Sequence, residues 1–201
     1  MLNNSLSRRD FGAGLLAGAA VAALPLPALA LDINSARAMI DTAIGEVNAV
    51  INSGKSEAAM YPDFERIFVR YADVPAIARS ALGVASRTAS PGQMSAFTKA
   101  YQGYISRKYG RRFREFIGGK IEVVDAKPLK SYFEVISVAH LQGEAPFDLR
   151  WHVSNKSGKD LFFNIIIEGV NMLASERTEI GAMLDARRGN LDLLIEDLKT
   201  A

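Results

Sequence analysis

Two histidines, His140 and His152, are the side chains of this sequence that ordinarily titrate near neutral pH. A catalytic histidine needs a nucleophile in an elbow or triad context, and no such motif accompanies either one. His140 ends a strand-like run and is expected at the surface or rim. In the run 147–155, alternation places His152 with Asp148 and Arg150, opposite the apolar residues, so we expect His152 to face solvent. We predict no catalytic residue.

Metal and cofactor chemistry finds no better support in the sequence. The chain has no cysteine, which excludes thiol catalysis, cysteine zinc sites and disulfides. It contains no H-E-x-x-H motif, no calcium loop, no histidine cluster and no glycine-rich phosphate loop. We predict neither a metal nor a cofactor. An enzyme whose acid–base residues come from distant positions remains an alternative.

A basic segment, "RKYGRRFREF", is the densest cluster of charge. Its basic residues are Arg107, Lys108, Arg111, Arg112 and Arg114. On a helix they lie opposite Phe113 and Phe116, which favours a solvated face. The alternative is a docking patch for an acidic partner or anionic headgroups, with Arg111 and Arg112 as candidates. The formal net charge of +2 gives no reason to expect nucleic acid as a partner.

The first 30 residues have the features of an export signal. The paired Arg8 and Arg9 resemble a twin-arginine motif, an apolar run follows, and Ala28 and Ala30 supply a small-residue cleavage site. The Leu and Lys of that motif are absent, so the general secretory route stays open. A membrane anchor is disfavoured because the apolar run is short for a span of about 20 residues and contains prolines. We expect residues 1–30 to be removed and the protein to be periplasmic.

The rest of the chain changes from helical to strand periodicity and back. Apolar residues at spacings of three and four predict helices over 32–53, 63–71, 74–82, 91–117, 173–187 and 191–200. Period-two alternation predicts strands within 121–128, 132–142, 147–155 and 159–172. Short connections make the sheet antiparallel. We predict one α+β domain over 31–201, with helices packed on one side of a curved four-stranded antiparallel sheet that encloses an apolar cavity.

The stretch "LFFNIIIEGVNML", 161–173, is the reason to expect a cavity. Apolar side chains occupy both parities of this strand, so both of its faces need cover from water. One large, filled core is one interpretation, and a ligand between sheet and helices is the other. The predicted lining residues are Phe97, Tyr101, Tyr104, Phe113, Ile136, Val138, Trp151, Phe163, Ile165 and Ile167.

Several segments resemble the MlaC or toluene-tolerance family of periplasmic phospholipid-binding proteins. They are "DVPAIARSALG" (73–83), "SPGQMSAFTKAYQGYISRKYG" (90–110), the four strand runs, "NIIIEGVNMLASERTEIGAML" (164–184) and "GNLDLLIEDLK" (189–199). The most specific match is Ile167-Glu168-Gly169-Val170, followed by Arg177. The sequence departs from the family pattern at Asn164, Asn171 and Glu176, where the family usually has Asp, Ser and Tyr.

The resemblance implies a lipid carrier without a catalytic step. Such proteins bind a phospholipid by its acyl chains and shuttle it between an outer-membrane lipoprotein complex and an inner-membrane ABC transporter complex with its lipid-binding subunit. This traffic maintains outer-membrane lipid asymmetry. We expect a monomer. The alternatives are a carrier of another amphipath such as a hopanoid, a periplasmic enzyme on a cone-shaped α+β scaffold, and an interaction protein with a filled core.

Overall fold

The structure is a computed structural model that describes residues 32–112 and 116–201. Within these ranges the elements are α1 (Ile33–Ile51), α2 (Glu57–Tyr71), α3 (Val74–Leu82), the 3₁₀ helix η1 (Gly83–Arg87), α4 (Pro91–Arg112), β1 (Lys120–Leu129), β2 (Tyr132–His140), β3 (Phe147–Ser154), β4 (Leu161–Ile167), β5 (Val170–Asn171), α5 (Met172–Ala186) and α6 (Leu191–Leu198). The export-signal residues Arg8, Arg9, Ala28 and Ala30, as well as Phe113 and Arg114, lie outside the described residues.

The fold is α+β, as predicted, with an antiparallel sheet in the order β1-β2-β3-β4-β5. The sheet of the described chain has five strands, so the prediction of four was wrong. The additional strand, β5, has two residues and pairs with the end of β4, Val170 opposite Ile167. Glu168 and Gly169 link them with φ of 48° and 81°, the left-handed conformation that a two-residue hairpin turn requires. The single strand predicted within 159–172 ran through this turn, although Glu168 and Gly169 interrupt its apolar pattern.

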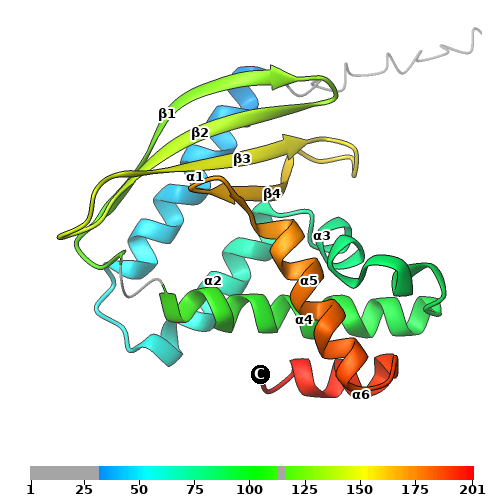
Figure 1. The fold of residues 1–201 in the computed structure, drawn as a ribbon. Coiled ribbons are helices and arrows are strands. Elements are labelled where there is room, and N and C mark those ends of the chain that lie inside the picture. Colours follow the sequence, from blue (N-terminus) through cyan, green and yellow to red (C-terminus); the bar gives the residue numbers. More distant parts are fainter. Residues whose placement is uncertain (1–31, 113–115) are drawn as a thin grey trace, which may run out of the picture.

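Figure 1 shows the helices gathered on one side of the curved sheet, which is the predicted layering. Helix α1 packs against β1, β2 and β3, while α3 and α5 pack against β4. Helices α2, α4 and α6 form the more distant part of the helical layer (Figure 1). The sheet therefore has an inner face, toward the helices, and an outer face. Val135, Leu149 and Val153 are buried on the inner face.

Helix boundaries follow from caps, with one exception. Ser90 and Gln93 exchange the two hydrogen bonds of a capping box at the start of α4, and the Asn190 side chain accepts from two amides at the start of α6. These predicted starts are confirmed. Helix α2, in contrast, begins at Glu57 rather than after Pro62. The turn before the proline is retained because Met60, only 3% exposed, packs in a small apolar cluster with neighbouring buried residues.

A β-bulge between β3 and β4 decides which side chains face the helices. His152 pairs with Asn164 and Val153 pairs with Phe162, which leaves Phe163 as the extra residue. The bulge changes the parity of β4, so Phe162 joins Ile165 on the inner side. The ring of Phe163 instead packs at centroid distances of 5.4 Å from Tyr132 and 5.8 Å from His152.

Candidate functional site

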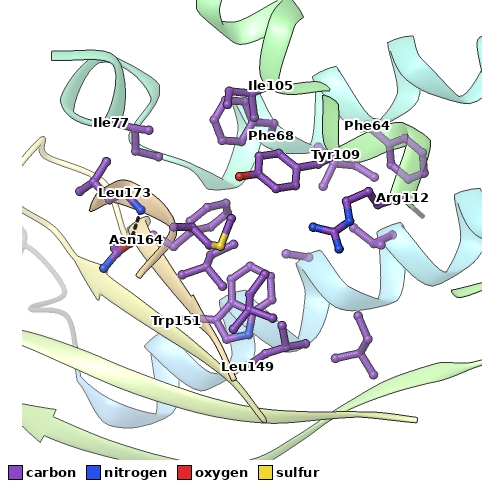
Figure 2. Close-up of a pocket in the computed structure, with 18 of the residues that line it drawn as sticks. Phe64, Phe68, Ile77, Ile105, Tyr109, Arg112, Leu149, Trp151, Asn164 and Leu173 are labelled. Carbon is purple, nitrogen blue, oxygen red and sulfur yellow. Dashed lines mark hydrogen bonds between the residues drawn. The ribbon is translucent and has the colours of Figure 1, made fainter. Parts of the chain in front are cut away.

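A cavity of about 330 Å³ lies between the inner face of the sheet and helices α1, α2, α3, α4 and α5. Its volume is at the small end of the range of about 300–1,000 Å³ that is typical of ligand pockets. The lining is mostly apolar, and Figure 2 shows side chains from both layers converging on it, among them Phe64, Tyr109, Leu149 and Trp151. The cavity is therefore suited to an apolar ligand.

Strand residues that line the cavity include Ile121, Phe147, Phe163 and Asn164. They also include Leu149, Trp151, Phe162, Ile165 and Ile167, and we call these last five the sheet wall. The indole N–H of Trp151 donates to the Ser137 hydroxyl oxygen at 3.1 Å, so the one polar atom of these side chains is already satisfied. The Phe162 ring meets Trp151 edge-on at a centroid distance of 5.3 Å. The sheet wall therefore offers apolar surface and no free polar side-chain atom.

The opposite side, the helix wall, includes Tyr101 and Tyr109 from α4 and Glu176 from α5. Glu176 is 3% exposed, and its Oε1 accepts hydrogen bonds from Lys108 Nζ at 2.7 Å and from the Tyr109 hydroxyl at 2.6 Å. Lys108 also binds Glu179 on the next turn of α5. Buried charge here is therefore paired.

Burial and ion pairing change the acidity of these groups. Burial raises the pKa of Tyr109, and its hydrogen bond to Glu176 adds to the rise. Burial opposes protonation of Lys108, but its hydrogen bonds to Glu176 and Glu179 outweigh this effect and raise the pKa of the ammonium. The tyrosine hydroxyl and the ammonium therefore stay protonated at neutral pH and hold Glu176 in place.

The model of the family described as MlaC protein matches residues 41–200. The chain belongs to the MlaC family. This match spans α2 to α6 and most of α1, so the sheet wall and the helix wall both lie within it.

One curated protein and one solved structure are similar to this chain of the MlaC family. The chain is 25% identical over 133 residues to the intermembrane phospholipid transport system binding protein MlaC of Haemophilus influenzae, which covers 61% of this chain and 62% of the relative. The chain thus spans less than two thirds of the curated relative that it matches. A solved phospholipid-binding protein from Ralstonia solanacearum, in complex with a phospholipid, matches with a TM-score of 0.69 and 19% identity, covering 81% of this chain and 94% of that one. The second likeness shows a shared fold.

Five of the predicted lining residues come together at the cavity of this MlaC protein. They are Tyr101, Trp151, Phe163, Ile165 and Ile167. Phe163 lines the cavity although its ring packs against Tyr132 and His152 on the other side of the bulge. Phe97 and Tyr104 are buried in the helical core beside them: the Phe97 ring stacks on Tyr101 at 5.6 Å, and the Tyr104 hydroxyl binds Glu179. Phe113 is outside the described residues.

Ile136 and Val138 do not line the cavity, which corrects their assignment to it. They pair with Arg150 and Asp148, respectively, in rows on the outer face of the sheet. The inner face of β2 is formed by the other parity, which includes Val135 and Ser137. All of β2 is rich in apolar residues, so its inner parity becomes clear only from its pairing with β3.

The basic segment divides between internal contacts and the cavity. Arg107 donates to the backbone oxygens of Leu198 and Ala201 at 2.6 and 2.8 Å, and Lys108 binds the two glutamates of α5. Arg112 is exposed and lines the cavity, whereas Arg111 is exposed without lining it. Figure 2 shows the Arg112 guanidinium extending toward the space between the two layers. A uniform solvated face does not describe these residues.

The prediction that His152 faces solvent was wrong, since it is 8% exposed. Its ring lies 4.8 Å from the Tyr132 ring, and its Nε2 lies 3.5 Å from Oε2 of the buried Glu134. The other ring nitrogen is 3.4 Å from the Asn164 amide, whose oxygen accepts from the Leu173 backbone N–H at the start of α5 (Figure 2). Alternation correctly placed His152 and Trp151 on opposite faces of β3. The face that carries His152 is covered by aromatic and polar neighbours instead of solvent. His152 on β3 thus contacts β2 and β4, and Asn164 extends this link to α5.

The described part of the chain contains no group of three or more acidic, histidine or cysteine side chains that could bind a metal ion. Among the helices of residues 32–112 and 116–201, none has the length and hydropathy needed to cross a membrane. His140 is half-exposed at the end of β2, as expected, with Nε2 3.4 Å from a Glu122 carboxylate oxygen.

Sequence reasoning missed most of the helix wall. Phe64, Phe68, Tyr109 and Glu176 line the cavity without having been predicted. The spacing of Phe64 and Phe68 by four residues is a signal that one face of α2 carries both. For Glu176 the sequence offers no comparable signal, because its partners on α4 are 67 and 68 residues away.

Proposed function

We propose that this protein is a carrier that binds a phospholipid by its acyl chains in the cavity and shuttles it between membranes. The observation that carries the proposal is the apolar cavity between the sheet wall and the helix wall, in a chain of the MlaC family. The name of the Haemophilus influenzae relative and the bound phospholipid of the Ralstonia solanacearum structure support the same ligand class.

The physical requirement for such a carrier is shelter for the acyl chains. Burying a methylene group is worth about 0.8 kcal/mol, so two chains of about 16 carbons represent on the order of 25 kcal/mol, as an upper bound. Apolar surface of this kind is supplied by residues such as Leu149, Trp151 and Ile165. The cavity of about 330 Å³ is small for two chains, so the number of chains held inside is a quantity to be measured.

The proposed cycle has no chemical step. It takes place in the periplasm, and its partners are an outer-membrane lipoprotein complex and an inner-membrane ABC transporter complex with its lipid-binding subunit. In this proposal the protein acts as a monomer and maintains outer-membrane lipid asymmetry. Arg111 and Arg112, at the exposed end of α4, are the proposed docking residues.

Native mass spectrometry of residues 31–201, purified from a periplasm without detergent, tests the proposal. A near-stoichiometric diacyl phospholipid, identified after solvent extraction, is the expected result, and its mass also gives the number of chains. A protein that is empty and also fails to take lipid from phospholipid vesicles would contradict the proposal.

A further inference from the structure

Two buried polar atoms of the helix wall have no hydrogen-bond partner within residues 32–112 and 116–201. They are the Tyr101 hydroxyl and Oε2 of Glu176. Tyr101 is fully buried and Glu176 nearly so, and both residues line the cavity. Buried polar side-chain atoms are almost always paired, so two unpaired atoms in residues that line one cavity indicate a partner that the described residues do not supply.

The chemistry of the missing partner follows from the two atoms. Oε1 of Glu176 already receives the Lys108 ammonium and the Tyr109 hydroxyl, so Oε2 is free to accept a hydrogen bond. The Tyr101 hydroxyl can donate one. Burial and, secondarily, the negative charge of Glu176 raise the pKa of Tyr101, which keeps that hydroxyl protonated.

The missing partner must accept a hydrogen bond from Tyr101 and donate one to Glu176, and most parts of a lipid cannot do both. A hydrocarbon chain neither donates nor accepts. An ester carbonyl accepts from Tyr101 but offers no hydrogen to Glu176. A hydroxyl group does both, because it has one donor and two acceptor lone pairs.

We propose that Tyr101 and Glu176 form a hydroxyl-binding subsite in the cavity, which favours an amphipath that carries a hydroxyl group within its apolar part. This inference rests on the proposed lipid-carrying function and refines its substrate class. The sheet wall then binds the hydrocarbon on either side of the hydroxyl, while the helix wall distinguishes hydroxylated chains from plain ones.

The experiment uses octadecanoic acid and a series of hydroxyoctadecanoic acids with the hydroxyl at successive positions. Each is titrated into the mature protein by calorimetry, with a diacyl phospholipid as the reference ligand. We expect one position in the series to bind about tenfold more tightly than octadecanoic acid, because a net hydrogen bond is worth about that factor. A hydroxyl placed elsewhere on the chain should weaken binding, since it is buried without a partner.

Substitutions identify the residues responsible. Tyr101→Phe removes the hydroxyl while keeping the ring. This variant should bind the best hydroxyoctadecanoic acid about as tightly as octadecanoic acid. Glu176→Gln should reduce the preference for the hydroxylated acid as well. Tyr104→Phe is the matched control, because Tyr104 is a buried tyrosine of the same helix that binds Glu179 and does not line the cavity. It should keep the full preference, and thermal unfolding checks that all variants fold.

The outcomes separate the inference from the function on which it rests. If the reference phospholipid binds but no hydroxylated acid is preferred, the two atoms hold an ordered water only and the inference is wrong. Retention of the preference in Tyr101→Phe would also overturn it. If neither the phospholipid nor any acid binds, the proposed carrier function itself fails.

Discussion

The two walls of the cavity differ in their polar atoms. The sheet wall contains one polar side-chain atom, the Trp151 indole nitrogen, and Ser137 satisfies it. The helix wall contains a buried carboxylate, an ion pair and two buried tyrosine hydroxyls, with two of its polar atoms unpaired in the described structure. In the proposed carrier, the sheet wall supplies general affinity for hydrocarbon and the helix wall supplies selectivity.

The difference follows from the geometry of the two kinds of element. On a strand, alternate residues face opposite sides, so polar side chains such as Glu134 and Arg150 are placed away from the apolar inner row. On a helix, the buried stripe is wider and includes residues three and four apart. In α4 that stripe contains Tyr101, Tyr104, Ile105 and Tyr109, so hydroxyl groups enter the interior along with their rings.

The largest effect is expected from a charge on the sheet wall. Ile165→Asp places a carboxylate against the acyl chains with no partner, and we expect complete loss of copurified lipid, because an unpaired buried charge costs far more than one chain contact contributes. Solvent extraction followed by mass spectrometry measures the lipid. The matched control is Ile166→Asp on the same strand, whose neighbour across the pair is Arg150 on the outer face. Equal lipid in both variants would show that Ile165 does not contact the ligand.

The next effect concerns the stability of the helix wall. Lys108→Met leaves Glu176 as a buried carboxylate without its cation. We expect the free energy of unfolding to fall by about 3–5 kcal/mol. The control is Lys120→Met, which breaks an exposed pair with Glu122 and should cost about 0–1 kcal/mol. Urea denaturation measures both. Similar losses in the two variants would mean that the Lys108–Glu176 pair is no more important than a surface contact.

Much of the fold could be predicted from local sequence. Capping residues such as Ser90 and Asn190 and the apolar periodicity locate most helices, because each signal acts within a few residues. Helix α3 has the predicted bounds, Val74–Leu82. The layering of helices on one side of an antiparallel sheet could also be predicted, because short connections leave few other arrangements.

The bulge and the helix wall could not be predicted in the same way. Strand β4 is apolar on both parities, so alternation alone cannot decide that Phe162 points inward while the Phe163 ring packs with Tyr132. The choice depends on pairing with β3. Similarly, Glu176 is an ordinary helix residue in the sequence, and only packing of α5 on α4 brings Lys108 and Tyr109 to it.

A smaller effect is expected on the outer side of the bulge, where the sheet itself carries buried polar groups. Burial lowers the pKa of His152, although the hydrogen bond and charge of Glu134 oppose the shift. Because its folded pKa lies below the unfolded value of about 6.5, the contribution of His152 to stability is present above that pH. It is lost as the pH falls through the folded pKa.

Denaturation at several values between about pH 5 and pH 7 measures this loss. One histidine changes the free energy of unfolding by at most about 1.4 kcal/mol per pH unit, and His152→Gln should remove that part of the slope. His140→Gln, at a half-exposed position on β2, is the control and should leave the slope in place. A wild-type stability that rises on acidification over this range would contradict the assignment.

The smallest effect is expected where the cavity meets solvent at the end of α4. Arg112 lines the cavity and Arg111 does not, although both are exposed. A cation near an anionic headgroup is worth about 1 kcal/mol, so Arg112→Glu should slow uptake of an anionic phospholipid from vesicles roughly fivefold at low salt. Raised salt should reduce the difference, because exposed charges are screened. Arg111→Glu should leave uptake unchanged, because Arg111 does not line the cavity and vesicles contain no partner complex on which it could dock. Equal slowing of lipid uptake by Arg112→Glu and Arg111→Glu would mean that both arginines attract the membrane surface. The position of Arg112 at the cavity would then make no difference.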